Sequence, residues 1–327
     1  MKHFALGLLA TLALQAAPPR IAEPLVAAAI EEYAPILVLH RDERYLPTRV
    51  DEYLKLTEPY PCQDAKGERL VTGLRFQTRL KAGTGAADPP RGGAPAQAMA
   101  YVNVKVGAAS TDLQYWFLYA YNGPSTAYLK TLGWDGRYDS RGDHDLGDNG
   151  AHEGDWEHLT VTISNATGKA VGGVYMGAHG QGGAWPLPAG GRVRAFASRN
   201  GHACYPAADR YYRAEWKLGL FEFRLVDNTS PPGLLVDFRH RTELVGIQGD
   251  AELAGQWQGA GFRPPPYVTA YGGRWGRVDI RPHPLASIPL VGSVVGFVLD
   301  QTGLLDELTV EAGPFPPWSK DSWQGPE

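Results

Sequence analysis

The chain has 327 residues, of which 40 are glycine, 26 proline, 9 tryptophan and 16 tyrosine, and only 20% are charged. The formal net charge of −4 leaves no excess of basic residues, which argues against nucleic acid or an anionic membrane as the main partner. Glycine, proline and aromatic residues in these amounts favour short strands and turns over long helices. The length is enough for one large domain with a sizeable core.

The N-terminus has the pattern of an export signal. A short basic segment, residues 1–3, precedes an apolar run over residues 4–14 that is too short to span a bilayer. Small residues up to Ala17 supply a cleavage site, and the prolines that follow end any helix. We expect residues 1–16 to be a signal peptide and residues 17–327 to form a secreted or periplasmic single domain without a transmembrane span. A buried N-terminal helix is the alternative.

The hydrophobic pattern predicts two short helices and then mainly strands. The helices are expected at residues 21–33 and 50–54, and residues 82–97 have the composition of a flexible surface insertion. Strands are expected at 36–40, 99–106, 113–121, 155–163, 171–176, 193–197, 220–226 and 234–238, with a long loop over 122–150. The expected fold is mostly β: an antiparallel β-sandwich with long loops, a few short helices and a Trp/Gly/Pro-rich C-terminal extension.

Two carboxylates stand at the start of one predicted strand. Side chains alternate across a sheet, so Asp155 and Glu157 share a face with three apolar residues, Leu159, Val161 and Ile163. The apolar residues must point into the core, and the two carboxylates therefore lie on the core face at the mouth of the strand. Buried carboxylates without partners are costly, and a hard cation bound by oxygen ligands removes that cost.

The residues before this strand extend the candidate metal site. His152 stands three residues before the first carboxylate and reaches the same point if Gly154 allows a sharp turn. Upstream, Asp143, Asp145 and Asp148 crowd a Gly-rich stretch, where carboxylates repel one another unless a cation gathers them. A solvated acidic loop with Asp in turn positions is the alternative.

Two more histidines are candidates for acid–base chemistry. His179 follows the strand predicted at 171–176, and His202 lies in a turn-rich stretch. Either is a candidate catalytic residue or a neighbour of the metal ligands, and the alternative for each is a histidine bonded to backbone in a turn. His158 falls on the opposite face from Glu157 and is not counted as a ligand.

Only two cysteines occur, Cys62 and Cys204. Export permits a disulfide between them, and two buried free thiols are the alternative. No paired Cys-x-x-Cys spacing is present, which argues against a zinc site built on cysteine.

A set of short motifs runs in order along most of the chain, at residues 33–37, 40, 45–47, 113–117, 154–158, 201–203 and 271–276. The set, which includes Gly-Asp-Trp-Glu-His at 154–158 and Gly-His-Ala at 201–203, resembles the vacuolar protein sorting-associated protein 62 family. The family name reflects a trafficking phenotype and implies no chemistry.

A second run, Ala-His-Glu-Gly-Asp-Trp-Glu at 151–157 with a later His-Gly at 179–180, is more distantly similar to the necrosis- and ethylene-inducing-like secreted toxins. Those toxins carry Gly-His-Arg-His-Asp-Trp-Glu on a single-domain β-sandwich and bind plant sphingolipid head groups. The resemblance implies cation ligands at His152, Asp155 and Glu157, with one upstream acid among Asp143, Asp145 and Asp148. Two departures, Glu153 for Arg and Gly154 for His, bear on target recognition rather than on the metal.

Three hypotheses follow for this site. The first is an exported metal-binding protein, toxin-like in its action, that engages a surface glycan or lipid head group. The second is a metal-dependent hydrolase, in which a cation held by His152, Asp155 and Glu157 activates water while His179 or His202 moves protons. In the third, the metal is purely structural.

The identity of the metal follows from the ligand types. Oxygen-rich ligands favour Ca²⁺ or Mg²⁺, whereas a histidine ligand keeps Mn²⁺ and Zn²⁺ open. Pairing of the two carboxylates with an arginine, such as Arg192 or Arg194, is the alternative that needs no metal.

Overall fold

A computed structural model of the protein describes residues 21–61, 76–80, 91–132, 138–145, 150–180, 182–188, 192–218, 221–276, 278–280 and 310–324. The predicted signal peptide, Cys62, Asp148 and most of the predicted insertion lie outside these residues. Among the helices in the described ranges, none is long and apolar enough to cross a membrane.

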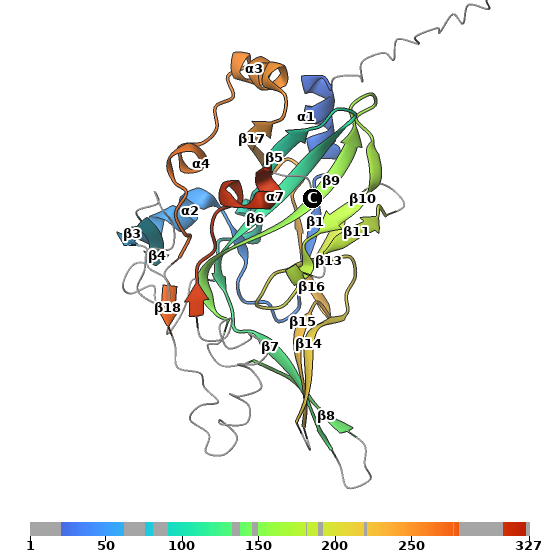
Figure 1. Ribbon diagram of the computed structural model, residues 1–327, viewed down its shortest axis with the longest axis vertical. Helices are drawn as coiled ribbons and strands as arrows, with labels where there is room; N and C mark the ends of the chain where they lie inside the picture. The colour runs from blue at the N-terminus through green and yellow to red at the C-terminus, as the bar shows by residue number, and fades with distance from the viewer. Residues whose placement is uncertain are drawn as a thin grey trace, which may run out of the picture.

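A seven-stranded sheet forms the centre of the molecule (Figure 1). Its two longest strands, β6 and β9, pair antiparallel along their length, and β17 is parallel to its neighbour β5. The sheet follows the order β11-β10-β9-β6-β5-β17, with β2 pairing to β6. Its strands are β2 (Pro47–Thr48), β5 (Ala100–Val106), β6 (Ser110–Asn122), β9 (His152–Ser164), β10 (Ala170–Met176), β11 (Gly183–Pro186) and β17 (Thr242–Gln248).

A second, four-stranded sheet packs against one face of the central sheet. Its order is β13-β12-β1-β16, and only the β1–β12 pair is parallel. Leu37 and Val236 from this sheet pack in one core with Tyr115, Phe117 and Leu159 of the central sheet. The strands are β1 (Ile36–His40), β12 (Arg194–Ala197), β13 (Cys204–Tyr205) and β16 (Pro232–Asp237). The predicted mostly β, sandwich-like fold is confirmed.

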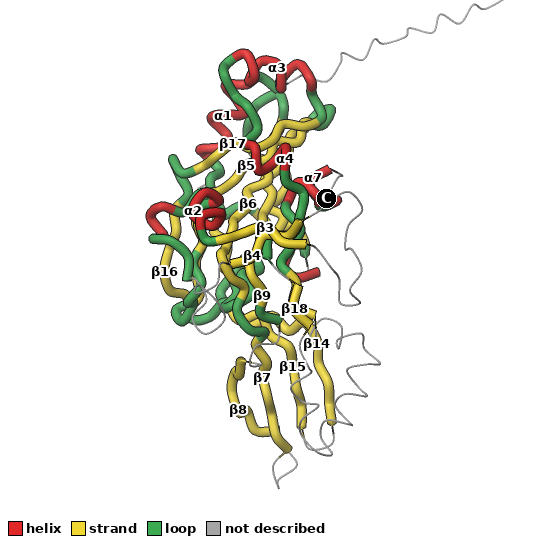
Figure 2. Tube along the Cα trace, turned by 90° about the vertical axis from the view of Figure 1, so that its left-hand side faces the viewer, coloured by secondary structure: helices red, strands yellow, loops and turns green. Residues whose placement is uncertain are grey.

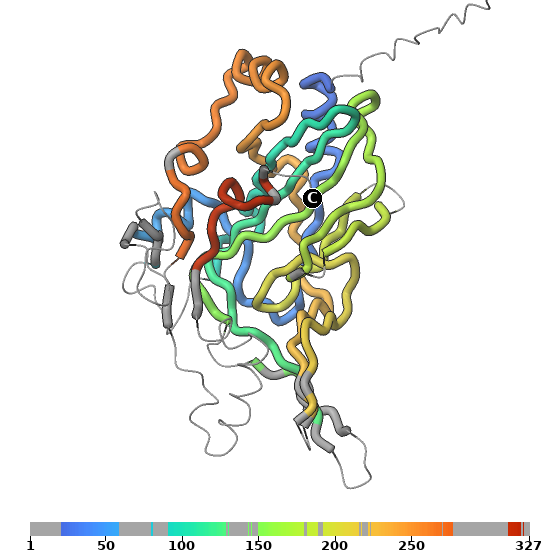
Figure 3. Tube along the Cα trace, in the orientation of Figure 1, coloured from blue at the N-terminus to red at the C-terminus, as the bar shows by residue number. Residues whose placement is uncertain are grey.

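Aromatic side chains cover the other face of the central sheet. Trp116 and Trp156, which alternate with the sandwich-facing residues of β6 and β9, pack there with Trp275 and Trp323 from the C-terminal part of the chain. Figure 3 shows this C-terminal segment, in orange and red, running along that face. Tryptophan in this region therefore builds a second core, because burying large aromatic surfaces is strongly favourable.

Four further strands form an arm that extends away from the sandwich, as Figure 2 shows at its lower end. This antiparallel sheet has the order β14-β15-β7-β8. The prediction of a long loop over 122–150 is wrong, because most of that stretch forms β7 and β8. β8 has no apolar alternation and is a strand through its pairing with β7. The strands are β7 (Thr126–Leu132), β8 (Tyr138–Asp145), β14 (Arg210–Leu218) and β15 (Phe221–Asn228).

The remaining elements are short. The two predicted N-terminal helices are present as α1 and α2, and the C-terminal third is less irregular than expected because it contains β17 and several short helices. The helices are α1 (Glu23–Glu32), α2 (Val50–Lys55), α3 (Ala251–Gly259), α4 (Pro266–Ala270), α7 (Asp321–Gln324), η1 (Pro95–Gln97), η2 (Ala178–Gly180) and η4 (Pro317–Ser319). Two small antiparallel pairs are β3 (Thr57–Pro61) with β4 (Phe76–Leu80), and β18 (Val278–Ile280) with β19 (Val310–Ala312).

Candidate functional site

The start of β9 carries the two carboxylates on the sandwich-facing side of the central sheet. Leu159, Val161 and Ile163, which follow on the same face, are all 0% exposed. Asp155 lies opposite Tyr119 of β6 and is buried, and Glu157 is partly buried. The alternation of the sequence therefore predicted the correct face for both carboxylates.

His152 reaches the same end of β9 because Gly154 bends the strand. Gly154 has φ +67°, and a Cβ there would lie 1.9 Å from the backbone oxygen of Trp275. Only glycine fits this backbone. The His152 Nδ1–H donates to the Gly154 carbonyl over 2.7 Å, and the Glu153 backbone also hydrogen-bonds the ring. Burial lowers the pKa of His152, although Asp155 opposes this, so its neutral form is favoured.

His202 bridges two buried carboxylates. Its Nδ1 donates to Oδ2 of Asp155 over 2.8 Å, its Nε2 lies 3.6 Å from Oε1 of Glu43, and its ring stacks on Tyr119 at 3.8 Å between centroids. Burial alone would lower the pKa of His202, but Glu43 and Asp155 outweigh it and raise that pKa to about 9. The positive charge that balances Asp155 in this structure is therefore an imidazolium, and neither Arg192 nor Arg194 supplies it.

Glu157 has no comparable counter-charge. Within the described part of the chain no group donates a hydrogen bond to its carboxylate, and burial together with the nearby Asp155 raises its pKa to about 7. Burial would also raise the pKa of Asp155, but the hydrogen bond from His202 reverses the direction and lowers it. The two carboxylates of β9 thus differ because, among the described residues, only Asp155 accepts a hydrogen bond from a cationic side chain, whereas His179, Lys320 and His202 act on Glu157 through space.

His179 forms a second carboxylate pair at this end of the sandwich. Its Nδ1 donates to Oδ2 of Asp227 over 2.7 Å, and the same oxygen accepts a hydrogen bond of 2.5 Å from the Tyr205 hydroxyl. Burial opposes a charge on His179, but Asp227 outweighs it and raises its pKa. The side chain of His179 is 27% exposed, so its outer edge meets solvent.

The loops that carry these histidines have an unusual backbone. Ala178, His179, Asn200 and His202 have φ between +44° and +68° and are four of the five non-glycine residues with positive φ in the described chain. This region of φ is unfavourable for residues with a Cβ, and such strain gathers at functional sites when the surrounding structure maintains it. The clustering therefore supports a function for this end of the sandwich.

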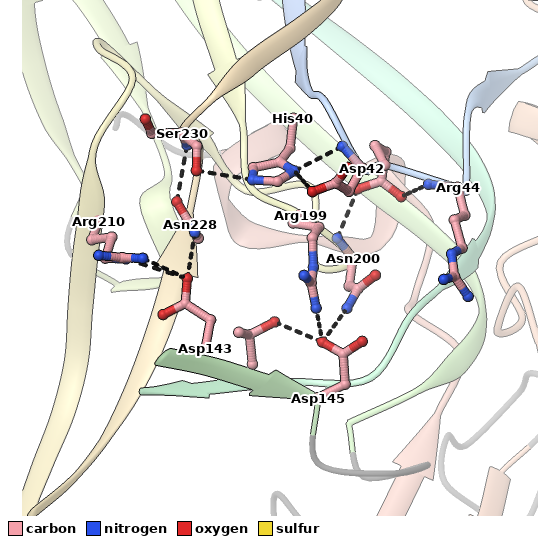
Figure 4. A network of polar contacts seen from close by, with 12 residues as sticks. His40, Asp42, Arg44, Asp143, Asp145, Arg199, Asn200, Arg210, Asn228 and Ser230 are labelled. Atoms are coloured by element: carbon pink, nitrogen blue, oxygen red, sulfur yellow. Dashed lines mark hydrogen bonds and ion pairs between the residues drawn. The ribbon is translucent and has the colours of Figure 1, made fainter. Parts of the chain in front are cut away.

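Asp143 and Asp145 lie on β8 and are held by arginines (Figure 4). Asp143 accepts hydrogen bonds from Arg210 at 3.1 Å and from Asn228 at 2.6 Å. Asp145 pairs with Arg199. These two predicted ligands therefore have their own counter-charges in a different network, and Asp148 lies outside the described residues.

The side chains of this site are of the types that bind cations, but they are not positioned around a common point. Asp155, Glu157 and the Nε2 of His152 are an acceptable donor set for Ca²⁺, Mg²⁺, Mn²⁺ or Zn²⁺. In the described chain, however, no three His, Cys, Asp or Glu side chains already surround one point as metal ligands. Binding a cation would require these groups to close on it.

Sequence reasoning missed Glu43 and Asp227, the carboxylates that orient His202 and His179. No local pattern marks them, since Glu43 follows β1 and Asp227 ends β15, and only the fold brings them to the histidines. Cys204 is a buried free thiol, whereas Cys62 lies outside the described residues.

Comparison with known proteins identifies the family of the chain. The family model described as vacuolar protein sorting-associated protein 62 matches residues 86–327, which include β9 and both site histidines. Neither the curated proteins nor the solved structures contain a significant match. Because the matched segment spans well over half of its length, the chain belongs to the vacuolar protein sorting-associated protein 62 family.

Proposed function

We propose that this protein is an exported, cation-dependent binding protein whose site at the start of β9 engages a surface glycan or lipid head group. His152, Asp155 and Glu157 would hold the cation. Ca²⁺ or Mg²⁺ is favoured over Mn²⁺ or Zn²⁺ because two of these three donors are carboxylates. When bound, the cation supplies positive charge and coordination positions for oxygens of the target.

One observation carries this proposal: three metal-type donors of one strand, two carboxylates and an imidazole, lie at the same end of the sandwich. Oδ1 of Asp155 takes no part in the bond to His202. Glu157 has no hydrogen-bond donor among the described residues, and the ring of His152 is oriented by the bond of its Nδ1–H to a backbone carbonyl. Histidines that bind metals are commonly oriented in this way.

Thermal unfolding with and without divalent cations tests the cation. Calcium or magnesium at 100 times its Kd should stabilise the folded protein by about 2.7 kcal/mol, and chelator should reverse this. Asp155→Asn and Glu157→Gln should lose the response, while Asp145→Asn, which changes an arginine-paired carboxylate, should keep it. Wild-type protein that holds no ion by elemental analysis and shows no cation effect would rule out the cation.

Binding to glycan arrays and to glycolipid-containing liposomes tests the target. The protein should bind in calcium or magnesium and release in chelator. His179→Ala should keep the thermal response to cation but lose target binding, because His179 is more exposed than His152, Asp155 or Glu157. Target binding that persists in chelator would show that the protein recognises its target without the cation.

The hydrolase remains a second candidate because His179 is oriented as a general base would be. Asp227 fixes Nδ1 as the donor, so Nε2 of the neutral ring can accept a proton. Turnover of chromogenic ester and phosphodiester substrates in the presence of cation tests this candidate. Turnover that His179→Ala abolishes would favour the enzyme, and none above background in wild type would remove it.

A further inference from the structure

Strand β16 forms an open edge of the sheet β13-β12-β1-β16. In the described part of the chain it pairs with β1 alone, so its other side has no neighbouring strand. Leu234 and Leu235 stand in the middle of this strand and are 45% and 57% exposed, more than any other large hydrophobic residue that the structure describes. The edge of β16 is therefore both open and apolar at its centre.

The backbone of β16 presents hydrogen-bonding groups along this edge. Just beyond the strand, the Phe238 N–H donates to the Pro35 carbonyl at 3.1 Å, on the side of β1. In an antiparallel pair, alternate residues turn their N–H and C=O groups toward the partner strand. Val236, two residues before Phe238, therefore turns its backbone groups toward β1, whereas Leu235 and Asp237 turn theirs toward the open edge.

The outer face of the same sheet has an apolar row that ends at this edge. Leu235 lies opposite Val38 of β1, and Val38 lies opposite Phe196 of β12. Leu37, the residue before Val38, packs in the sandwich core, so the row lies on the face turned away from that core. A further strand beside β16 would extend the row by one side chain, which would pack against Leu235.

An arginine lies at each end of the open edge. The Arg41 N–H donates to the Pro231 carbonyl at 2.9 Å, which places Arg41 at the start of β16, and Arg239 follows shortly after its end. Both arginines are exposed, and no ion pair joins either one to another described residue. The carboxylates closest to them in sequence, those of Asp42 and Asp237, contact other side chains. Each end of the edge thus has a guanidinium that is available to a ligand.

We propose that β16 binds an extended peptide segment of a partner protein, which adds to the sheet as a fifth strand. The peptide is apolar in its middle, where it packs against Leu234 and Leu235, and acidic at its ends, where it meets Arg41 and Arg239. In such strand addition the backbone hydrogen bonds supply affinity, and the alternating side chains supply specificity. Complementary charge at the ends adds selectivity and fixes the register.

A second copy of this chain fits the edge less well than an acidic peptide does. If two β16 strands paired antiparallel, Arg41 of one copy would lie beside Arg239 of the other, and parallel pairing would place like arginines side by side. Like charges at this distance repel. Pro231 and Pro232, around the start of the strand, also have no N–H to donate. These features oppose the self-association that an open edge otherwise invites.

An anionic membrane matches the arginines but not the leucines. Successive residues of a strand point to opposite faces, so Leu234 and Leu235 cannot both enter a bilayer from one side. An extended peptide contacts both leucines, because its own side chains alternate in the same way. The arrangement of the apolar residues therefore favours the peptide.

Fluorescein-labelled heptapeptides test the inference by fluorescence anisotropy with the full-length mature protein. The first peptide is Glu-Val-Thr-Val-Thr-Val-Glu, the second has lysine in place of both glutamates, and the third has Pro-Pro in place of the central Thr-Val. We expect the glutamate-ended peptide to bind saturably and at least tenfold more tightly than the lysine-ended one. The proline peptide should not bind, because it lacks backbone donors at its centre.

Two variants of the edge should change this binding in different ways. Leu235→Pro removes an outward N–H and an exposed side chain, so it should weaken binding of the glutamate-ended peptide at least tenfold. The fold should persist, because proline is tolerated in an edge strand where the N–H faces solvent. Reversing both charges with Arg41→Glu and Arg239→Glu should transfer the preference to the lysine-ended peptide. Val171→Thr is the control: it changes a 43% exposed apolar residue of β10 and should leave the affinity unchanged.

Hydrogen exchange locates the bound peptide. The amides of Leu235 and Asp237 should exchange more slowly when the glutamate-ended peptide is bound, while the amide of Val236, which faces β1, should not change. No binding of this peptide, equal affinity for the glutamate- and lysine-ended peptides, or protection elsewhere in the chain would overturn the inference. Dimerisation that Leu235→Pro abolishes would assign the edge to a second copy instead, and binding to phosphatidylserine vesicles without peptide binding would assign it to a membrane.

Discussion

Carboxylates near the junction of the sandwich and the arm belong to two regions that balance their charge differently. Asp143 and Asp145, on the arm, are paired with Arg210 and Arg199. Asp155, at the mouth of the sandwich, is balanced by a histidine that is 0% exposed. Glu157 beside it has a pKa raised to about 7. Of these four carboxylates, Glu157 is the one without an ion-paired or hydrogen-bonded cation among the described residues, since His179, Lys320 and His202 act on it only through space.

This difference shows why counting acidic residues does not locate a metal site. Asp143 and Asp145 of the arm each pair with an arginine, and an exposed pair such as that of Asp145 contributes little free energy. The sandwich site buries Asp155 and Glu43, where each unbalanced charge is costly. Replacing members of each region should therefore produce effects of different size.

His202→Ala should have the largest effect. It leaves Asp155 and Glu43 buried without their shared cation, and breaking a buried pair in this way costs about 3–5 kcal/mol. Urea denaturation at neutral pH measures the loss. Arg199→Ala, the control in the arm network, should cost less than about 1 kcal/mol. Equal losses of stability for the two variants would show that the charges of the two regions are balanced in the same way.

Gly154→Ala should come next. Its φ of +67° is unfavourable for alanine, and the added Cβ would lie 1.9 Å from the Trp275 backbone oxygen. Strain and overpacking of this kind cost roughly 1–3 kcal/mol each. The same change at Gly172, also at positive φ but with nothing within 4 Å, isolates the conformational part. A loss no greater than that of Gly172→Ala would mean that the backbone of β9 can move away from Trp275.

Alternation predicted the parts of the fold that pack on themselves. Tyr115 and Phe117 on one face of β6, with Trp116 between them on the other, identify a strand buried on both sides. β8 was missed because its residues have no such pattern and its strand geometry comes from pairing with β7. Strands of this kind are set by tertiary context rather than by propensity.

The candidate site was predictable only as far as its local geometry. The shared face of Asp155 and Glu157, and the bend at Gly154, follow from positions within one short stretch. The partners of the histidines do not, since the His202–Asp155 and His179–Asp227 bonds join residues 47 and 48 positions apart. A single sequence contains no signal for such pairs, so the imidazolium beside Asp155 was not predicted, while the cation stays a prediction.

Glu157→Gln should change the free energy of unfolding by less than Gly154→Ala does, and it should increase that free energy rather than decrease it. In chelator at pH 8 the wild-type carboxylate is ionised although burial and Asp155 raise its pKa to about 7. A neutral amide removes this repulsion, so the variant should be more stable than wild type by on the order of 1 kcal/mol. Thermal unfolding in chelator measures the gain. A less stable variant would show that Glu157 already has a favourable partner.

Asp145→Asn should change stability by less than about 1 kcal/mol. The Asp145 side chain is 45% exposed, and solvent screens its pairing with Arg199. Asparagine keeps an oxygen that can accept from Asn200 and Thr126, which also contact Asp145. Urea denaturation at low and at 1 M salt checks the result, because the difference should shrink as salt increases. A loss of stability comparable to that of His202→Ala would show that Asp145 behaves as a buried carboxylate rather than as an exposed one.

The smallest effect is expected for Asp237→Asn, because Asp237 forms an exposed pair with Arg192. Arg192 donates to both of its oxygens, at 2.9 and 2.5 Å, and this hydrogen bonding lowers the pKa of Asp237 from 3.8 to about 2. A lowered pKa means that the pair stabilises the fold fully above pH 3.8 and loses that contribution as pH falls through about 2. The side chain is 48% exposed, so screening limits the contribution to under about 1 kcal/mol. Wild type should therefore exceed Asp237→Asn slightly in melting temperature at pH 6, and the difference should vanish near pH 2. A difference that grows toward low pH would have the wrong sign for a carboxylate held by arginine.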